Sequence, residues 1–346
     1  MRSKFKHLTK TDRIKIEVLL KRKIPIKEIA EEIGMHFTTV YREIRLGKIV
    51  QRDSELIERR VYCADFSYAR YRENLRAKGP GLKIGKDIAL ANYIEDKILN
   101  FGYSPAAVLG EISRSKHLKF STTISEWTLY SYIGKGVFLN LTNKDLPVKG
   151  KRKKEYRKIR KIGRPPQGKS IEKRPEDVNE RESFGHWEMD SLIGRGTKSH
   201  RLLVLTERLT RKEIAVRVFD GTSESVVRAL DGIERKYGRL FYKIFCSITV
   251  DNGSEFSNCA GMEKSCRKKG NRTTIYYCHP YSSWERGSNE KQNQMLRRKF
   301  PKGTDFNKIA NDEINKAVYW LNNYPREMFE FETAEMRYQA ALSEVV

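Results

Sequence analysis

The chain has 346 residues, with 69 Lys and Arg against 44 Asp and Glu, so its formal net charge is +25 at pH 7. Hydrophobic residues make up 38% of the chain, which is enough to build cores and excludes wholesale disorder. No apolar run approaches the ~20 residues of a membrane span, and no apolar segment typical of a signal peptide follows the N-terminus. Five Cys without a CxxC pair fit a reducing compartment. We therefore expect a cytoplasmic, nucleoid-associated protein of prokaryotic type whose excess positive charge predicts a nucleic-acid partner.

Three short helices are predicted within residues 1–50. The first is capped at Thr11-Asp12 and ends near Arg22, the second spans Pro25–Ile33, and the third spans about Thr38–Arg45. The third helix turns apolar residues toward the core, which leaves four polar side chains facing outward: Thr38, Thr39, Arg42 and Arg45. Such side chains can reach base edges or phosphates in a major groove, so the pattern predicts a helix-turn-helix DNA-binding domain. A plain three-helix packing unit is the alternative.

Three further segments precede the C-terminal part of the chain. Residues 51–85 are predicted to form a helical connector. Residues 86–140 form a second helical domain, with helices over Asp87–Asn100, from Ser104-Pro105 onward, and after the cap Ser125. This domain is either a second helix-turn-helix or a packing module. Residues 141–180 read as a basic linker, because Lys149–Arg174 contains 13 basic residues against two acids, a density that favours contact with phosphates.

Residues 181–346 change in character and predict a mixed α/β domain. Short β-branched runs predict strands at Leu202–Thr206, Ile214–Phe219 and Ile244–Val250, and a helix over Ser223–Tyr237 separates the last two. A further amphipathic helix is predicted over Ile314–Asn323.

Three acidic residues in this domain stand out by context. Asp190 lies in an extended run that begins at Gly185, Asp251 follows an apolar strand, and Glu290 opens a helix for which Ser288 is a plausible cap. Hard oxygen ligands suit Mg²⁺, and two such ions ~3.5–4 Å apart can activate the nucleophile and stabilise the leaving oxygen of a phosphodiester. From the residues alone, three unconnected surface acids remain the alternative.

The surrounding segments carry a resemblance to a known family. Gly185-His-Trp-Glu-Met-Asp190, Val250-Asp-Asn-Gly-Ser-Glu-Phe256 and His279 to Glu290 resemble the signature of transposases of the insertion-sequence-thirty family, in the DDE superfamily with retroviral-integrase-like cores. The resemblance covers nearly the whole chain. It implies an RNase H-like catalytic domain over residues 181–346 with Asp190, Asp251 and Glu290 as the catalytic and metal-binding triad. It also implies two Mg²⁺ ions per site, with Mn²⁺ as a substitute.

Two features of the catalytic region depart from the family pattern. The spacing expected in the family is the 33 residues that separate Asp251 from Glu285, whereas 38 separate it from Glu290. Because Glu285 lies upstream of the Asn-Glu of the motif, we assign an insertion to residues 257–274 and keep Glu290. His186 occupies a position that is often acidic in relatives. The insertion region contains Cys259, Cys266 and Cys278-His279, whose spacing fits no common zinc pattern, so we expect free thiols there.

The combined reading is a DDE transposase, a metal-dependent polynucleotidyl transferase for DNA recombination. We expect it to bind the terminal inverted repeats of its own element, cleave the ends and join the 3′-hydroxyl to target DNA as a homodimer or larger assembly. Basic residues near the triad are predicted to contact double-stranded DNA: Arg286, Lys291, Arg297 and Arg298. Trp284 is predicted to pack rather than to stack on a base. The rival function is a helix-turn-helix regulator with an inactive RNase H-like domain.

Overall fold

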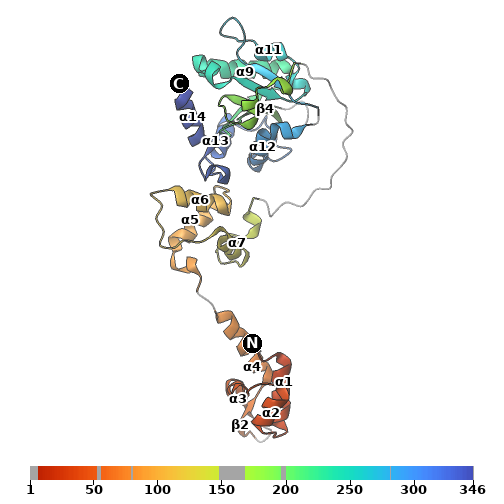
Figure 1. Ribbon diagram of the computed structural model, residues 1–346, viewed down its shortest axis with the longest axis vertical. Coiled ribbons are helices and arrows are strands. Elements are labelled where there is room, and N and C mark those ends of the chain that lie inside the picture. Colours follow the sequence, from red (N-terminus) through yellow and green to blue (C-terminus); the bar gives the residue numbers. More distant parts are fainter. Residues whose placement is uncertain are drawn as a thin grey trace. The chain divides into compact units, whose positions relative to one another are not determined.

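The computed structural model describes residues 7–52, 56–78, 81–147, 168–195, 200–280 and 282–345. The chain divides into two compact units, Met1–Lys83 and Ile84–Val346 (Figure 1). Within the described residues, no helix combines the length and the apolar character needed to cross a membrane.

The first unit begins with three helices, α1 (Lys10–Lys21), α2 (Ile26–Ile33) and α3 (Phe37–Leu46). The predicted cap of α1 was two residues late, because Thr9 is the N-cap and Asp12 completes a capping box from the third helical position. Three fully buried side chains, one from each helix, form the centre of the core: Ile16, Ile29 and Val40.

A buried ion pair fixes α1 against α3. Arg13 Nε lies 2.7 Å from Glu43 Oε1, and both side chains are almost fully buried. The hydroxyl of Tyr62 donates to Glu43 at 3.1 Å and that of Ser67 donates to the same oxygen. Because a buried carboxylate is tolerated only when its oxygens are paired, this cluster ties the residues after α3 to the three helices.

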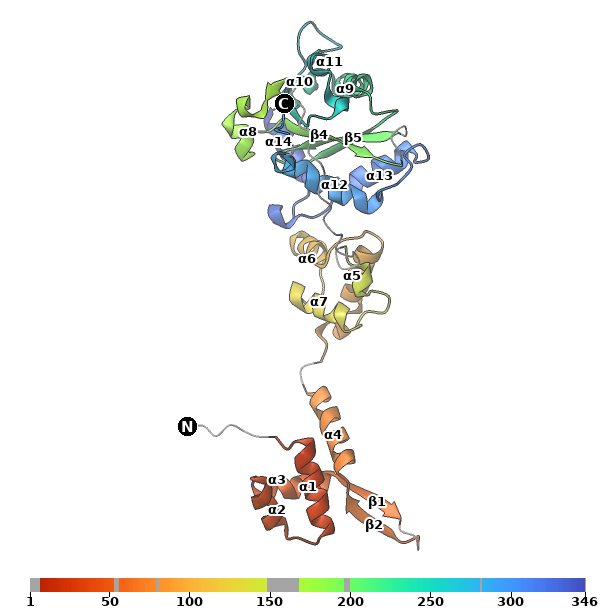
Figure 2. The same ribbon diagram turned by 90° about the vertical axis from the view of Figure 1, so that its right-hand side faces the viewer.

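An antiparallel hairpin follows α3 and precedes α4. Strand β1 (Lys48–Arg52) pairs with β2 (Glu58–Tyr62), and the helix α4 (Ala64–Ala77) follows (Figure 2). The predicted helical connector over residues 51–85 was therefore wrong in its first part. Ile49 and Val61 pair across the hairpin and are both half-buried among charged neighbours.

The second unit opens with α5 (Ile88–Leu99), α6 (Pro105–Arg114) and α7 (Glu126–Gly134). The predicted cap Ser125 is confirmed, because it accepts a hydrogen bond from a backbone N–H of the first turn, and Asp87 and Ser104, at the predicted starts of the other two helices, do the same. These helices share a core with residues from the end of the chain, including Tyr324. The indole Nε1 of Trp320 donates to the carbonyl of Phe101 at 2.6 Å.

A mixed six-stranded sheet forms the rest of the unit, in the order β3-β8-β7-β4-β5-β6. The strands are β3 (Lys169–Ser170), β4 (His186–Ile193), β5 (Arg201–Glu207), β6 (Glu213–Val218), β7 (Ser247–Val250) and β8 (Thr274–Tyr277). Strands β4, β5 and β6 are antiparallel, whereas β7 and β8 run parallel to β4. This order and these directions are those of an RNase H-like domain, which confirms the predicted fold class.

Helices cover both faces of this sheet (Figure 2). The helix α9 (Ser223–Tyr237) covers one face, with buried Trp187 and Phe241 between, and its bounds match the prediction. On the other face lie α12 (Gly287–Lys299) and α13 (Asn311–Asn322), packed through Leu296 and Leu321. The chain ends in α14 (Ala334–Val345).

Two boundaries within this unit differ from the prediction. The predicted strand 244–250 begins only at Ser247, because Phe241–Ile244 form the short helix α10. The basic linker 141–180 is not irregular throughout: residues 148–167 lie outside the described residues, but β3 pairs with β8 and Glu176–Glu180 form α8. Part of the predicted insertion forms α11 (Cys259–Glu263).

Candidate catalytic site

Adjacent parallel strands bring Asp190 and Asp251 together. Glu188 of β4 pairs with Thr249 of β7; Asp190 lies two residues further along β4, and Asp251, two residues after Thr249, directly follows the end of β7. Residues at equal offsets on paired parallel strands are level and share a face of the sheet. The guanidinium of Arg286 joins the two carboxylates, with Nη1 3.3 Å from Asp190 Oδ1 and Nη2 2.9 Å from Asp251 Oδ2.

Glu290 lies on α12 and faces the same region as Asp190. Both residues line a cleft of about 1020 Å³. Its other lining residues are mostly polar: Asp145, Pro147, Arg286, Asn289, Asn293, Gln294, Arg297, Arg298, Pro301 and Lys302. Glu290, Gln294 and Arg297, which are four and three residues apart on α12, all belong to this lining.

Glu285 is held elsewhere. Its carboxylate accepts a hydrogen bond from the backbone N–H of His279 at 2.9 Å and contacts the ring Nδ1 of His279 at 2.7 Å. These contacts, together with Glu172, raise the pKa of His279. Glu285 does not line the cleft that Asp190 and Glu290 share.

The start of α12 is fixed by a side chain of β4. No side chain of its own caps this helix, so the predicted cap Ser288 was wrong. Instead, Glu188 Oε2 accepts from the backbone N–H of Asn289 at 2.8 Å, and the side-chain amide of Asn289 donates to the Glu188 carbonyl at 3.0 Å. Glu188 is fully buried and pairs with Arg208. It thereby links the strand of Asp190 to the helix of Glu290.

Asn293 is a further site residue that the sequence interpretation missed. Its side-chain amide donates to Asp190 Oδ2 at 2.8 Å, and its position three residues after Glu290 was the available signal. Burial raises the pKa of Asp190, while the charge of Arg286 opposes that rise and the neighbouring Asp251 adds to it. Glu188 gave a weaker signal, as an acid between the apolar residues Trp187 and Met189.

The predicted DNA-contacting residues fall into two groups. On α3, Thr38, Arg42 and Arg45 are exposed and Thr39 is half-buried. On α12, the predicted DNA-contacting residues lie in different environments. Lys291 is exposed, whereas Arg297 donates to the carbonyl of Ile193 at 2.9 Å.

Arg298 and Trp284 have environments that the sequence did not indicate. The guanidinium of Arg298 donates to the carbonyl of Gly102 and lies over the rings of Trp320 and Tyr324 at 5.1 and 5.5 Å. Trp284 is 72% exposed, so the prediction that it packs was wrong.

The carboxylates fit a divalent metal ion. Asp190 and Asp251 already share one cation, the Arg286 guanidinium, which shows that their oxygens converge on a common position. Asp190, Asp251 and Glu290 can each offer a metal ion carboxylate oxygens, the ligand type that Mg²⁺ prefers.

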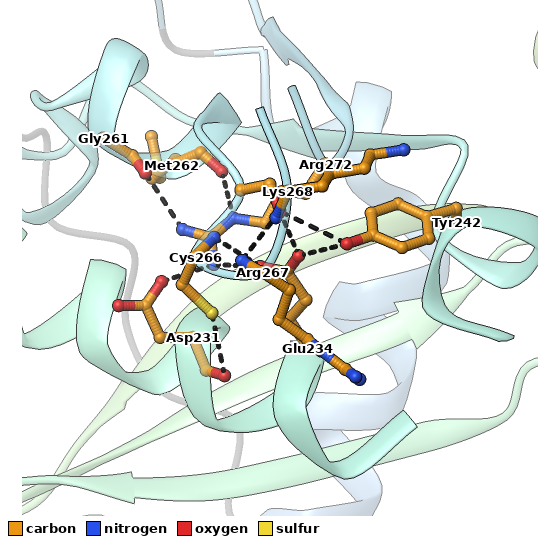
Figure 3. A network of polar contacts seen from close by, with 10 residues as sticks. Asp231, Glu234, Tyr242, Gly261, Met262, Cys266, Arg267, Lys268 and Arg272 are labelled. Atoms are coloured by element: carbon orange, nitrogen blue, oxygen red, sulfur yellow. Dashed lines mark hydrogen bonds and ion pairs between the residues drawn. The ribbon is translucent and has the colours of Figure 1, made fainter. Parts of the chain in front are cut away.

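A second group of acids lies beside α9, in the region of the predicted insertion. Within the described residues, Asp231, Glu234 and Cys266 form the cluster whose potential ligand atoms lie within 4.8 Å of one another. Arg272 occupies this cluster, with Nη1 2.6 Å from Asp231 and 3.3 Å from Glu234 (Figure 3). The network is therefore a structural one, which ties the loop after α11 to α9. Cys259, Cys278 and His279 do not belong to it.

Glu234 makes this network sensitive to acid. Burial pushes its pKa up, but hydrogen bonds from Ser265, Tyr242 and the backbone of Cys266 outweigh burial and hold the pKa at about 2 instead of 4.5. The stability that this carboxylate contributes is present above pH 4.5 and is lost as the pH falls toward 2.

We predict that Glu234→Gln lowers the free energy of unfolding at neutral pH and that its difference from wild type shrinks between about pH 4.5 and 2. Urea denaturation at several pH values measures this difference. Asp312→Asn, at an exposed ion pair of α13, is the control and should show little effect at any pH. A difference for Glu234→Gln that does not change with pH would contradict the prediction.

The chain is similar to several known proteins. Residues 4–46 match a helix-turn-helix domain family. The transposase of insertion sequence element IS4351 from Bacteroides fragilis is 30% identical, over 98% of this chain and 97% of its own length. The probable transposase of IS1161 from Streptococcus salivarius is 29% identical, over 97% of this chain and 95% of its own length.

One further relative and one solved structure complete the comparison. The transposase InsI of IS30A from Escherichia coli (strain K12) is 29% identical, over 94% of this chain and 82% of its own length. The catalytic core domain of BIV integrase aligns over 47% of this chain and 98% of its own, with a TM-score of 0.34 and 15% identity. With a relative at 30% identity over nearly its whole length, the chain belongs to the IS30 family of insertion-sequence transposases, DNA-binding polynucleotidyl transferases of the DDE type.

Proposed function

We propose that Asp190, Asp251 and Glu290 are the catalytic residues of this transposase and hold Mg²⁺, with Mn²⁺ as a substitute. One observation carries the proposal: a single guanidinium joins Asp190 to Asp251 at the edge of a cleft that Glu290 also lines. When bound, a pair of divalent ions ~3.5–4 Å apart lowers the barrier to attack on an anionic phosphodiester.

The chain's own residues orient this set. Asn293 and Arg286 hold the Asp190 carboxylate from two sides, and Glu188 fixes the helix that carries Glu290. Catalytic groups need such positioning because small misplacements cost large factors in rate. The basic side chain of Arg297, on the cleft wall, can pair with a DNA phosphate.

The proposed reaction has two steps, and in each one a P–O bond forms as another breaks. In the first, water attacks a phosphorus at the element end, the bond to the 3′-oxygen breaks, and a 3′-hydroxyl is released. In the second, that hydroxyl attacks a target phosphodiester in line, so a new P–O bond forms as the target strand's P–O bond breaks. Neither step requires a covalent bond to the protein, so no Ser or Tyr nucleophile is invoked.

The N-terminal unit supplies recognition of the element's terminal inverted repeats. Its helix α3 exposes Thr38, Arg42 and Arg45, which can reach base edges in a major groove. Pairing two ends in one complex calls for at least a dimer. These events take place on chromosomal DNA, in the bacterial cytoplasm.

We predict that Asp190→Asn, Asp251→Asn and Glu290→Gln each abolish cleavage of a labelled terminal repeat in Mg²⁺ while binding of that repeat persists. The reason is that each substitution removes a charged metal ligand without removing the recognition helix. Cleavage is measured on denaturing gels and binding by mobility shift.

Glu285→Gln is the matched control, because it makes the same change five residues away at a carboxylate that is tied to His279. It should retain cleavage. Loss of cleavage in Glu285→Gln together with retention in Glu290→Gln would overturn the assignment of the third carboxylate.

We predict that Arg42→Ala reduces the preference for the terminal repeat over random duplex by roughly 1–3 kcal/mol, the value of a good base contact. Competition binding with both duplexes measures the preference, and Lys15→Ala, an exposed change on α1, is the control. An equal loss of affinity for both duplexes would show that Arg42 contacts phosphate instead of a base.

A further inference from the structure

A small cationic cavity lies beside the first turns of α12. Its volume is about 270 Å³, against about 30 Å³ for one water in the liquid, so it has room for an anion and some hydration. Four of its lining residues are basic and none is acidic. The lining residues are Arg181, Arg211, Gly287, Ser288, Lys291, Gln292, Arg326 and Met328.

Four of the residues that line this cavity carry a buried donor without a partner among the described residues. The Nη1 of Arg211, the Nε of Arg326 and the hydroxyl of Ser288 have no hydrogen-bond partner among the described residues. These three residues are only 8%, 9% and 4% exposed. The Nε of Arg181 is buried and unpartnered as well. Buried donors are almost always satisfied in native proteins, so four at one cavity indicate a missing acceptor.

The other atoms of these side chains are firmly held, which keeps the orphan donors in place. Arg326 donates from Nη1 to Gln292 Oε1 at 3.1 Å and from Nη2 to the carbonyl of Leu321 at 3.0 Å. The side-chain amide of Gln292 donates in turn to the carbonyl of Arg211. The donors around the cavity are therefore organised before any ligand arrives.

Charge in the cavity is not balanced by nearby acids. Burial lowers the pKa of Arg211 to about 10, and the charge of Arg181 adds to that effect. Burial likewise lowers the pKa of Arg326 to about 10. Three acids that do not line the cavity raise these pKa values, Glu188 and Glu207 at Arg211 and Glu213 at Arg326. They offset only part of the lowering that burial causes. Both groups stay cationic near neutral pH, so an anion would stabilise them.

Two of the lining arginines have an unfavourable backbone conformation, which also indicates a binding site. Arg181 and Arg211 both have left-handed backbone, with φ of 63° and 62°. Side chains other than Gly adopt this region at a cost, and such strain is concentrated at binding sites.

The start of α12 contributes positive potential. Gly287 and Ser288 are in the first turn of this 13-residue helix, where the helix dipole favours anions. Glu188 already uses the N–H of Asn289 in the same turn. The cavity and the active-site cleft share no lining residue: Ser288, Lys291 and Gln292 line the cavity, whereas Glu290 and Asn293 line the cleft.

We propose that this cavity binds a phosphate group of the DNA backbone, across α12 from the active-site cleft. Single guanidinium N–H donors from three arginines and a hydroxyl supply the charge-assisted hydrogen bonds that a phosphate accepts. A backbone phosphate held here would fix the DNA strand relative to the helix that carries Glu290. The DNA source of the phosphate rests on the proposed function, whereas the anion site itself does not.

The first arm of the test uses inorganic phosphate and the full chain. Thermal unfolding is measured in phosphate and in chloride at matched ionic strength. The melting temperature of wild type should rise with phosphate beyond its value in chloride. Ser288→Asp places a tethered carboxylate among the orphan donors and should abolish the phosphate dependence. Arg181→Ala should weaken phosphate binding about tenfold, while the exposed Arg239→Ala should behave as wild type.

The second arm measures affinity for the terminal-repeat duplex at several salt concentrations. Loss of one phosphate contact in Ser288→Asp or Arg181→Ala should reduce the slope of log K against log salt by about one. A wild type that responds equally to phosphate and chloride would overturn the site. A phosphate response with unchanged DNA slopes in both variants would overturn its assignment to DNA. Neither arm measures cleavage. Both results can therefore be interpreted even if the assignment of the catalytic residues is wrong.

Discussion

The attachment of α12 to β4 is the constraint on which the site depends. Asp190 and Glu290 are a hundred residues apart in the chain, and one buried side chain, Glu188, connects their elements. A buried carboxylate is costly unless its oxygens are paired. Glu188 meets that condition with Arg208 and the N–H of Asn289, so a shift of the helix along the strand would remove the donor to one of its buried oxygens.

The same helix separates two opposite electrostatic environments. One side faces a cleft with Asp190 and Glu290, and the other borders a cavity with Arg181, Arg211 and Arg326. An enzyme that acts on DNA must bring carboxylates close to an anionic backbone, which Coulomb repulsion opposes. Arg286 between the two aspartates reduces this repulsion, and cations across the helix supply attraction beyond the cleft.

Local chemistry made much of the fold predictable. The helix starts at Asp87 and Ser104 and the cap Ser125 have local physical signals and were identified correctly, as was α9 from its helical period. The hairpin β1–β2 was missed because its few apolar residues lie among charged ones. Its position is set by tertiary contacts, notably Tyr62 with the buried Glu43, which no local pattern reveals.

The site was predictable only in part. Motif context singled out the three carboxylates, but Arg286 was assigned to phosphate contact and instead joins two of them. Glu188 was not recognised, because its role comes from the packing of α12. The cationic cavity could not be anticipated, since Arg181, Arg211 and Arg326 come from separate elements that meet only in the folded domain.

The most direct test of the central claim, that β4, β7 and α12 assemble one metal-binding set, is calorimetric titration of the full chain with Mn²⁺ in the absence of DNA. Wild type and Glu285→Gln should bind with equal affinity. Glu290→Gln should bind Mn²⁺ at least roughly 10–100-fold more weakly than wild type. That is the loss expected when a residue that merely supports a metal ligand is removed, and Glu290 is itself a proposed ligand. Unchanged Mn²⁺ affinity in Glu290→Gln, with a loss in Glu285→Gln, would contradict the account.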